Sequence, residues 1–207
     1  MKILLVFLFL ITGGGLETQG KSALSSQELQ QAQHCVKAAV DRLCEHISQL
    51  GNSPDNGGAS PAEKQRILRT QVKHLFYYFD YRRVATTGKN GTVRRKADTY
   101  FNNLIDQSLR KSYRTIYKVE PSEAYLSSKH FNLRKMDVDA EGTTRYVTEI
   151  ELKQTYIRTA GGSYREGATP PTVVDYTRKK LRLYVLVSSD GDVLCKLGDI
   201  FVAQKIR

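Results

Sequence analysis

The chain changes its hydrophobic spacing about half-way along its length. Before Tyr113, apolar residues recur every three or four positions, which is the period of an amphipathic helix. From Tyr113 onward they alternate with polar residues, as in strands with one buried and one solvated face. Helices followed by antiparallel strands predict an α+β fold, with two to three N-terminal helices packed on one face of a sheet.

Three helices are predicted in the first half of the chain. Ser25 and Glu28 have capping-box spacing, and the apolar stripe that follows runs to Gly51. A second helix begins after Ser60, with proline at its first position. The third helix is indicated by a later apolar set: Tyr100, Phe101, Leu104, Ile105 and Leu109.

Residues 87–105 read TGKNGTVRRKADTYFNNLI and combine a turn, a basic run and the start of a helix. Asn90 and Gly91 tolerate the positive φ angles of a type I′ turn, which predicts a short hairpin between residues 81–87 and 92–97. Strict alternation over 144–159 and 178–187 predicts two long strands, and Gly198 interrupts a last strand as a bulge or bend would.

The first 20 residues have the layout of a secretory signal peptide. A positive start is followed by ILLVFLFLI and then by small residues that end at Gly20. This apolar run is much shorter than the roughly 20 residues that a membrane-spanning helix needs. We therefore expect a signal peptide over 1–20, one domain over 21–207, a secreted or periplasmic location, and no membrane span after cleavage. An uncleaved membrane anchor is the alternative.

The formal net charge of +11 at pH 7 favours anionic partners such as acidic polymers. Five cations flank the predicted hairpin turn and are called the basic rim: Arg82, Arg83, Arg94, Arg95 and Lys96. The rim either keeps the hairpin soluble or attaches loosely to an anionic partner. No specific nucleic-acid site is predicted, because the neighbouring aromatic residues belong to a helix core. Lys179 and Lys180 are interpreted as lysines of equal charge elsewhere on the sheet.

The three cysteines are Cys35, Cys44 and Cys195. If Cys35 and Cys44 share one helix, about 13.5 Å of helix rise separates them, whereas a disulfide needs Cα atoms within about 7 Å. These two are therefore predicted not to pair. Either of them could reach Cys195, and the sequence leaves that choice open. No spacing typical of a metal site is present.

The layout of N-terminal helices, a short hairpin and long antiparallel strands resembles the nuclear-transport-factor-2-like (cystatin-like cone) superfamily. In exported members from Bacteroidetes-type bacteria, the turn and the helix after it resemble GKNGTVRRKADTYFNNLI, and the final hairpin resembles DGDVLCKLGDIFV. The resemblance covers about residues 25–206. It implies a curved antiparallel sheet in a cone-shaped α+β barrel, a conical cavity and homodimer formation. By this resemblance, the residues that could line the cone are Tyr78, Asp80, Tyr100, Tyr146 and Tyr156.

The sequence contains no motif that is typical of a particular reaction, cofactor or metal site. The leading hypothesis is an exported, non-enzymatic module that binds a small ligand or a partner protein. A small lyase or isomerase that uses the cone is one alternative, because enzymes of this fold combine a carboxylate with a tyrosine donor. A periplasmic subunit of an envelope secretion assembly is the other.

Overall fold

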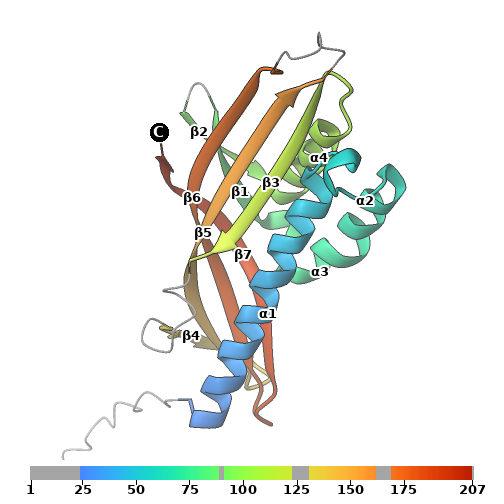
Figure 1. The fold of residues 1–207 in the computed structure, drawn as a ribbon. Helices are drawn as coiled ribbons and strands as arrows, with labels where there is room; N and C mark the ends of the chain where they lie inside the picture. The colour runs from blue at the N-terminus through green and yellow to red at the C-terminus, as the bar shows by residue number, and fades with distance from the viewer. Residues whose placement is uncertain (1–23, 89–90, 123–130, 162–168, 207) are drawn as a thin grey trace, which may run out of the picture.

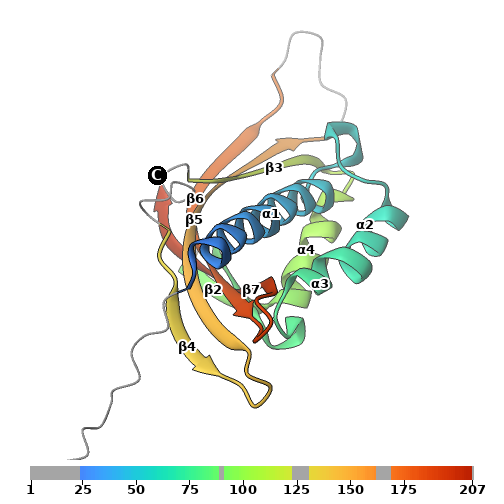
Figure 2. The same cartoon turned by 90° about the horizontal axis from the view of Figure 1, so that it is seen from below.

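The computed structural model describes residues 24–88, 91–122, 131–161 and 169–206. Its helices lie on the concave face of a curved seven-stranded sheet, so that the molecule has two layers (Figure 1, Figure 2). The predicted α+β class, with three helices packed on a sheet, is confirmed. The predicted signal peptide lies outside the described residues. None of the described helices has both the length and the apolar character needed to cross a membrane.

The long first helix, α1 (Ser26–Gly51), runs along the concave face of the sheet (Figure 2). Its predicted capping box is present: the Glu28 amide donates to Ser25 Oγ at 3.2 Å, and the Ser25 amide donates to the Glu28 carboxylate at 2.7 Å. The helix ends at Gly51, as predicted. A Cβ on Gly51 would come within 2.5 Å of the Tyr117 ring, so glycine is needed there because α1 approaches the sheet closely.

The second helical segment is continuous but not uniformly α-helical. It comprises α2 (Pro61–Ile67), a π-helical turn η2 (Leu68–Val72) and α3 (Lys73–Leu75), and it follows a short 3-10 turn, η1 (Pro54–Asn56). Ser60 caps it, since its Oγ accepts the Glu63 amide at 3.3 Å. The chain then passes through a second 3-10 turn, η3 (Phe79–Tyr81), before the hairpin.

The predicted hairpin and third helix are confirmed. Strands β1 (Arg83–Gly88) and β2 (Gly91–Lys96) pair antiparallel, with Gly88 opposite Gly91 and Arg83 opposite Lys96. Helix α4 (Ala97–Ser108) begins immediately after β2, and Tyr100, Phe101, Leu104 and Ile105 are buried on its inner side. The absence of a linker between β2 and α4 places the helix directly against the sheet.

The remaining strands are β3 (Tyr113–Pro121), β4 (Arg134–Val138), β5 (Thr144–Ala160), β6 (Thr172–Val187) and β7 (Val193–Ile206). The sheet order is β2-β1-β7-β6-β5-β3, and β4 pairs with β5. Between β6 and β7, Leu181 pairs with Ile200 and Leu183 with Leu197, so two residues of β7 oppose Arg182. The bulge predicted at Gly198 is therefore present.

The sheet differs from the cone-shaped barrel that the resemblance implies. Strand β7 pairs with β1 in parallel, through Val84 and Ile200, so the sheet is mixed although mostly antiparallel. It is also not closed, because β2 and β3 remain its two outer strands. Helix α4 contacts both of these strands. The cavity described below lies between this helix and the open sheet.

Candidate functional site

A cavity of about 240 Å³ opens between α4 and the sheet. It is lined by Thr86, Thr87, Val93 and Arg95 of the hairpin, Tyr100, Asn103, Leu104 and Gln107 of α4, Tyr117 of β3, Gln154 and Tyr156 of β5, and Asp175, Thr177 and Lys179 of β6. These elements are far apart in the sequence and meet only in the fold. The lining mixes aromatic rings with a few polar groups, which is the usual composition of a small-molecule site.

Lys179 is the most unusual residue of this lining. Its side chain is 4% exposed, and its ammonium lies 5.1 Å from the centre of the Tyr100 ring. Burial lowers the pKa of Lys179 to about 8, and no acidic side chain in the described part of the chain counteracts that effect. A buried ammonium without an acidic partner is costly. It is therefore a candidate for pairing with an anion that enters the cavity.

Two further polar atoms of the cavity lack a hydrogen-bond partner. The Tyr100 hydroxyl and Gln154 Oε1 are both buried and unpaired among the described residues. Most buried polar atoms in proteins are hydrogen-bonded, so each exception calls for an explanation. Burial also raises the pKa of Tyr100, which keeps its hydroxyl protonated and able to donate. The cavity thus offers an ammonium, a hydroxyl donor and an amide oxygen acceptor.

The other walls are aromatic and hydroxylated. The rings of Tyr117 and Tyr156 lie 4.7 Å apart, and the Tyr117 hydroxyl donates to Gln107 at 3.2 Å. The hydroxyls of Thr87 on β1 and Thr177 on β6 lie 3.5 Å apart in the same lining. The two tyrosine rings are tilted by 37° to each other and give an aromatic surface against which the ring of a ligand could pack.

The structure brings only two of the five proposed cone-lining residues, Tyr100 and Tyr156, to this cavity. Tyr78 is 64% exposed and has a left-handed backbone with φ of 55°, and Asp80 is also exposed. Tyr146 is buried in the hydrophobic core, away from the cavity lining. Burial raises its pKa, and Glu28 at the start of α1 raises it further.

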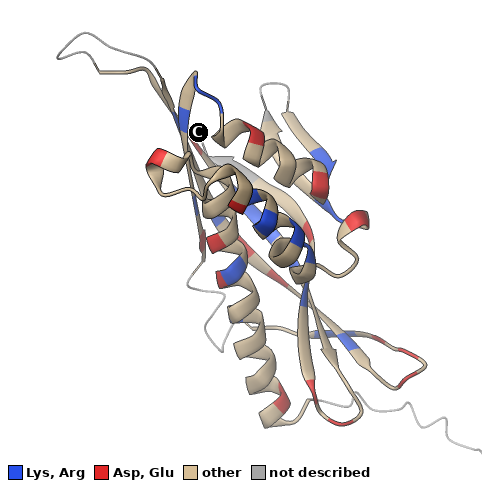
Figure 3. Cartoon of the chain, turned by 90° about the vertical axis from the view of Figure 1, so that its right-hand side faces the viewer, with Lys and Arg blue, Asp and Glu red and all other residues tan. Residues whose placement is uncertain are grey.

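The basic rim does not form one continuous surface. Arg82 packs its guanidinium over the rings of Tyr77 and Tyr184, at 5.6 and 5.1 Å from their centres. Arg94 forms an ion pair with Asp199 at 3.3 Å. Lys and Arg are distributed over several helices and strands in Figure 3. Local contacts with neighbouring rings and acids therefore engage two of the five cations.

The other three rim residues differ in position. Arg95 is exposed and lines the cavity, so it adds a positive charge near the cavity lining. Arg83 and Lys96 lie opposite each other at the base of the hairpin and are exposed. Arg94 and Arg95 are consecutive on β2, so their side chains point to opposite faces. Only Arg95 of the five belongs to the cavity.

Lys179 and Lys180 have equal charge and lie on the sheet away from the rim, but they are not equivalent, because Lys179 is buried. The alternation that places Leu181, Leu183 and Val185 on the buried face also places Lys179 and Thr177 there. That signal was present in the sequence, but it could not indicate whether the side chain meets a cavity or an acidic partner. Lys180 is exposed on the other face of the strand.

No group of three or more histidine, cysteine or acidic side chains that could hold a metal ion occurs in residues 24–88, 91–122, 131–161 and 169–206. Comparisons of the chain with protein-family models, with curated proteins and with solved structures find no match.

Proposed function

We propose that this chain is an exported, non-enzymatic binding module of nuclear-transport-factor-2-like type, and that it binds a small organic anion in the cavity between α4 and the sheet. The observation that carries the proposal is the Lys179 ammonium, which is buried in the cavity wall without an acidic partner among the residues that the structure describes. An anionic ligand would supply the missing countercharge in a low-dielectric environment, where such a pair is strong.

The unpaired polar atoms narrow the chemistry of the ligand. The protonated Tyr100 hydroxyl can donate to the same anionic group as Lys179. Gln154 Oε1 accepts only, so it requires a hydroxyl or amine donor from the ligand. The ring wall of Tyr117 and Tyr156 fits a planar apolar body between these two ends. We therefore propose a small hydroxylated carboxylate as the ligand class, with Arg95 as the charge that attracts it.

para-Hydroxybenzoate is a suitable probe because it joins a carboxylate to a hydroxyl through a flat ring. We expect it to bind the full chain and to shift the backbone amide NMR signals of residues that line the cavity. para-Hydroxybenzyl alcohol has nearly the same shape but no charge, and it should bind at least tenfold more weakly. Equal binding of acid and alcohol would overturn the proposal, and so would shifts that map away from the cavity.

The isomerase alternative is favoured by one specific observation. Asp175 lines the cavity together with Tyr100, which gives the combination of a carboxylate and a tyrosine donor that proton-transfer enzymes use. Asp175→Asn distinguishes the two functions. A binding module should keep its affinity for para-hydroxybenzoate or gain affinity, because a negative charge is removed from the cavity. An isomerase that relies on Asp175 as its base would instead lose turnover while it still binds.

A further inference from the structure

Two of the three cysteines meet in the fold, although 159 intervening residues separate them in the sequence. Cys35 lies on α1 and Cys195 on β7, and both side chains line the same surface groove. Cys195 is 8% exposed, and its Sγ lies 4.0 Å from the carbonyl oxygen of Ala32, one helical turn before Cys35. Helix α1 and strand β7 therefore hold two thiols side by side across the two layers of the molecule.

The two thiols differ in their access to solvent. A surface groove of about 880 Å³ lies between α1, the end of α3 and the start of β7, and both cysteines contribute to its lining. Cys35 is half-buried in this groove, whereas Cys195 is buried and belongs to the hydrophobic core as well as to the groove lining. A small molecule that enters the groove would reach Cys35 first.

The groove also stabilises a thiolate at Cys35. The hydrogen bond from Cys195 lowers the pKa of Cys35 to about 7, and the positive charges of Arg42 and Lys196 act in the same direction. The pKa of Cys195 is raised, because Cys35 takes the negative charge and Cys195 is more deeply buried. Cys35 is therefore the nucleophile of the pair, and Cys195 remains a thiol.

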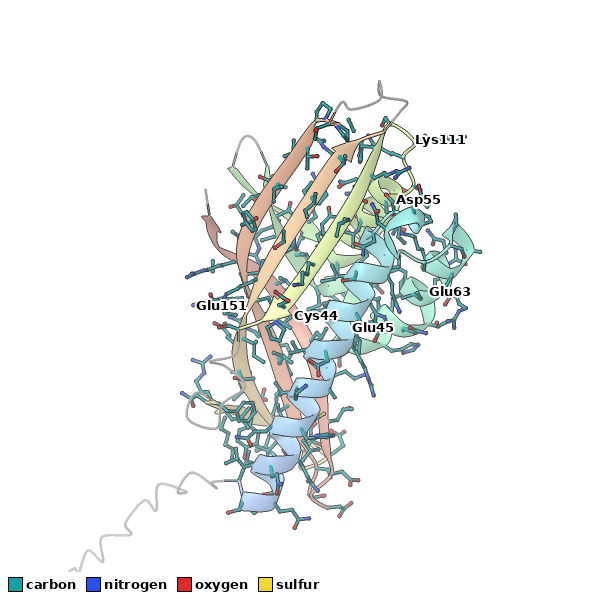
Figure 4. All side chains as sticks on the ribbon, viewed as in Figure 1. Cys44, Glu45, Asp55, Glu63, Lys111 and Glu151 are labelled. Carbon is teal, nitrogen blue, oxygen red and sulfur yellow. The ribbon has the colours of Figure 1, made fainter. Side chains whose placement is uncertain are left out.

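Cys44 provides a built-in comparison on the same helix. It lies on the side of α1 that faces β3 (Figure 4). Burial together with the charges of Asp41 and Glu120 raises the pKa of Cys44 to about 12. The continuous helix α1 keeps Cys44 apart from Cys35, as the sequence predicted. Of the two thiols on α1, only Cys35 is placed beside Cys195.

We propose that Cys35 and Cys195 are a thiol–disulfide exchange pair, in which Cys35 attacks a small disulfide that enters the groove and Cys195 completes a disulfide between α1 and β7. The Cys35 thiolate attacks one sulfur of the small disulfide, whose S–S bond breaks and releases one thiolate. Cys195 then loses its proton, attacks the Cys35 sulfur and releases the second thiolate. The two protein thiols are oxidised, and the small disulfide is reduced to two thiols.

The resulting bond would tether the N-terminal half of α1 to the sheet. A disulfide that closes so long a loop restricts the unfolded chain strongly, so the oxidised protein should resist unfolding better than the reduced one. The state of this bond would then report the redox potential of the compartment that the protein occupies. This inference rests on the groove and its thiols and does not depend on the ligand of the cavity.

The test uses the full chain, first reduced and then treated with glutathione disulfide at pH 7. Non-reducing peptide mapping should find a Cys35–Cys195 disulfide, with Cys44 still open to alkylation. In Cys195→Ser the reaction should stop at the first step, so that glutathione accumulates on Cys35. In Cys35→Ser neither product should form, and Cys44→Ser should behave like the parent protein. A crosslink of Cys195 to Cys44, or no crosslink at all, would overturn the proposal.

A second measurement uses the parent protein, so that its result does not depend on whether the variants fold. In the parent protein, iodoacetamide should modify Cys35 at least tenfold faster than Cys44 at pH 7, because the pKa of Cys35 is lowered to about 7 whereas that of Cys44 is raised to about 12. Unfolding in urea should abolish this preference. Equal rates for the two cysteines in the native protein would contradict the assignment of Cys35 as the nucleophile.

Discussion

Replacing Lys64 with methionine is expected to lower the free energy of unfolding by about 3 kcal/mol or more, since buried acceptors left unpaired cost ~1–3 kcal/mol each. Lys64 is fully buried, and its ammonium donates to the carbonyl oxygens of Leu50 at 2.9 Å and Asn52 at 2.5 Å, and to Ser108 Oγ at 2.8 Å. Burial lowers its pKa, but three oxygen acceptors favour the charged form. The residue thereby joins α2 to α4 and to the end of α1.

The reason for this large effect lies at the C-terminus of α1. The last carbonyl groups of a helix have no amide partner within the helix, and Lys64 supplies donors to two carbonyls at this end. Methionine retains most of the side-chain volume but donates no hydrogen bond. Urea denaturation measures the difference. Lys37→Met on the exposed face of α1 is the control, because its pair with Asp41 is solvated and should contribute less than about 1 kcal/mol. Similar stabilities for the two variants would show that the Lys64 hydrogen bonds contribute little.

Replacing Lys179 with glutamine is expected to weaken para-hydroxybenzoate binding at least tenfold, which corresponds to about 1.4 kcal/mol. The substitution removes the buried positive charge of the cavity and leaves only the exposed Arg95 as a countercharge to the carboxylate. The free energy of unfolding should rise or stay nearly unchanged, because a buried ammonium without an acidic partner is itself costly. Loss of binding without loss of stability would identify a residue retained for a ligand.

Lys180→Gln is the matched control for this experiment. It removes the same charge from the neighbouring position of β6, but its side chain is exposed on the other face of the sheet. The long-range field of the protein changes equally in the two variants. Titration calorimetry with para-hydroxybenzoate should therefore show near-parental affinity for Lys180→Gln. Equal losses in both variants would mean that the probe senses only net charge.

Local signals in the sequence predicted the local elements well. The capping box at Ser25 and Glu28 marks the start of α1, and the turn signal at Gly91 marks the hairpin, although Gly91 pairs with Gly88 as the first residue of β2 and not as the centre of the turn. These features depend on residues a few positions apart, so a single sequence is sufficient. The bulge at Gly198 could be predicted for the same reason, because the interruption of the alternating pattern is itself local.

The features that define the cavity depend on contacts between distant segments. The parallel pairing of Val84 with Ile200 makes the sheet mixed, and no local pattern encodes it. Tyr78 and Asp80 were expected to face a cone, but the chain leaves its helix at Phe76 and turns them outward. The alternation in β6 indicates that Lys179 points to the buried face of the sheet. Only the packing of α4 shows that a cavity lies next to this side chain.

The central claim is that the Lys179 ammonium holds an anion in the cavity, and the titration of this side chain by carbon NMR tests it most directly. Without ligand, the midpoint should lie near pH 8, since burial lowers the pKa of Lys179. A bound carboxylate stabilises the charged form, so saturating para-hydroxybenzoate should move the midpoint to higher pH. By linkage, affinity should fall as the pH rises through about 8. A Lys179 midpoint that the bound probe leaves unchanged would contradict the claim.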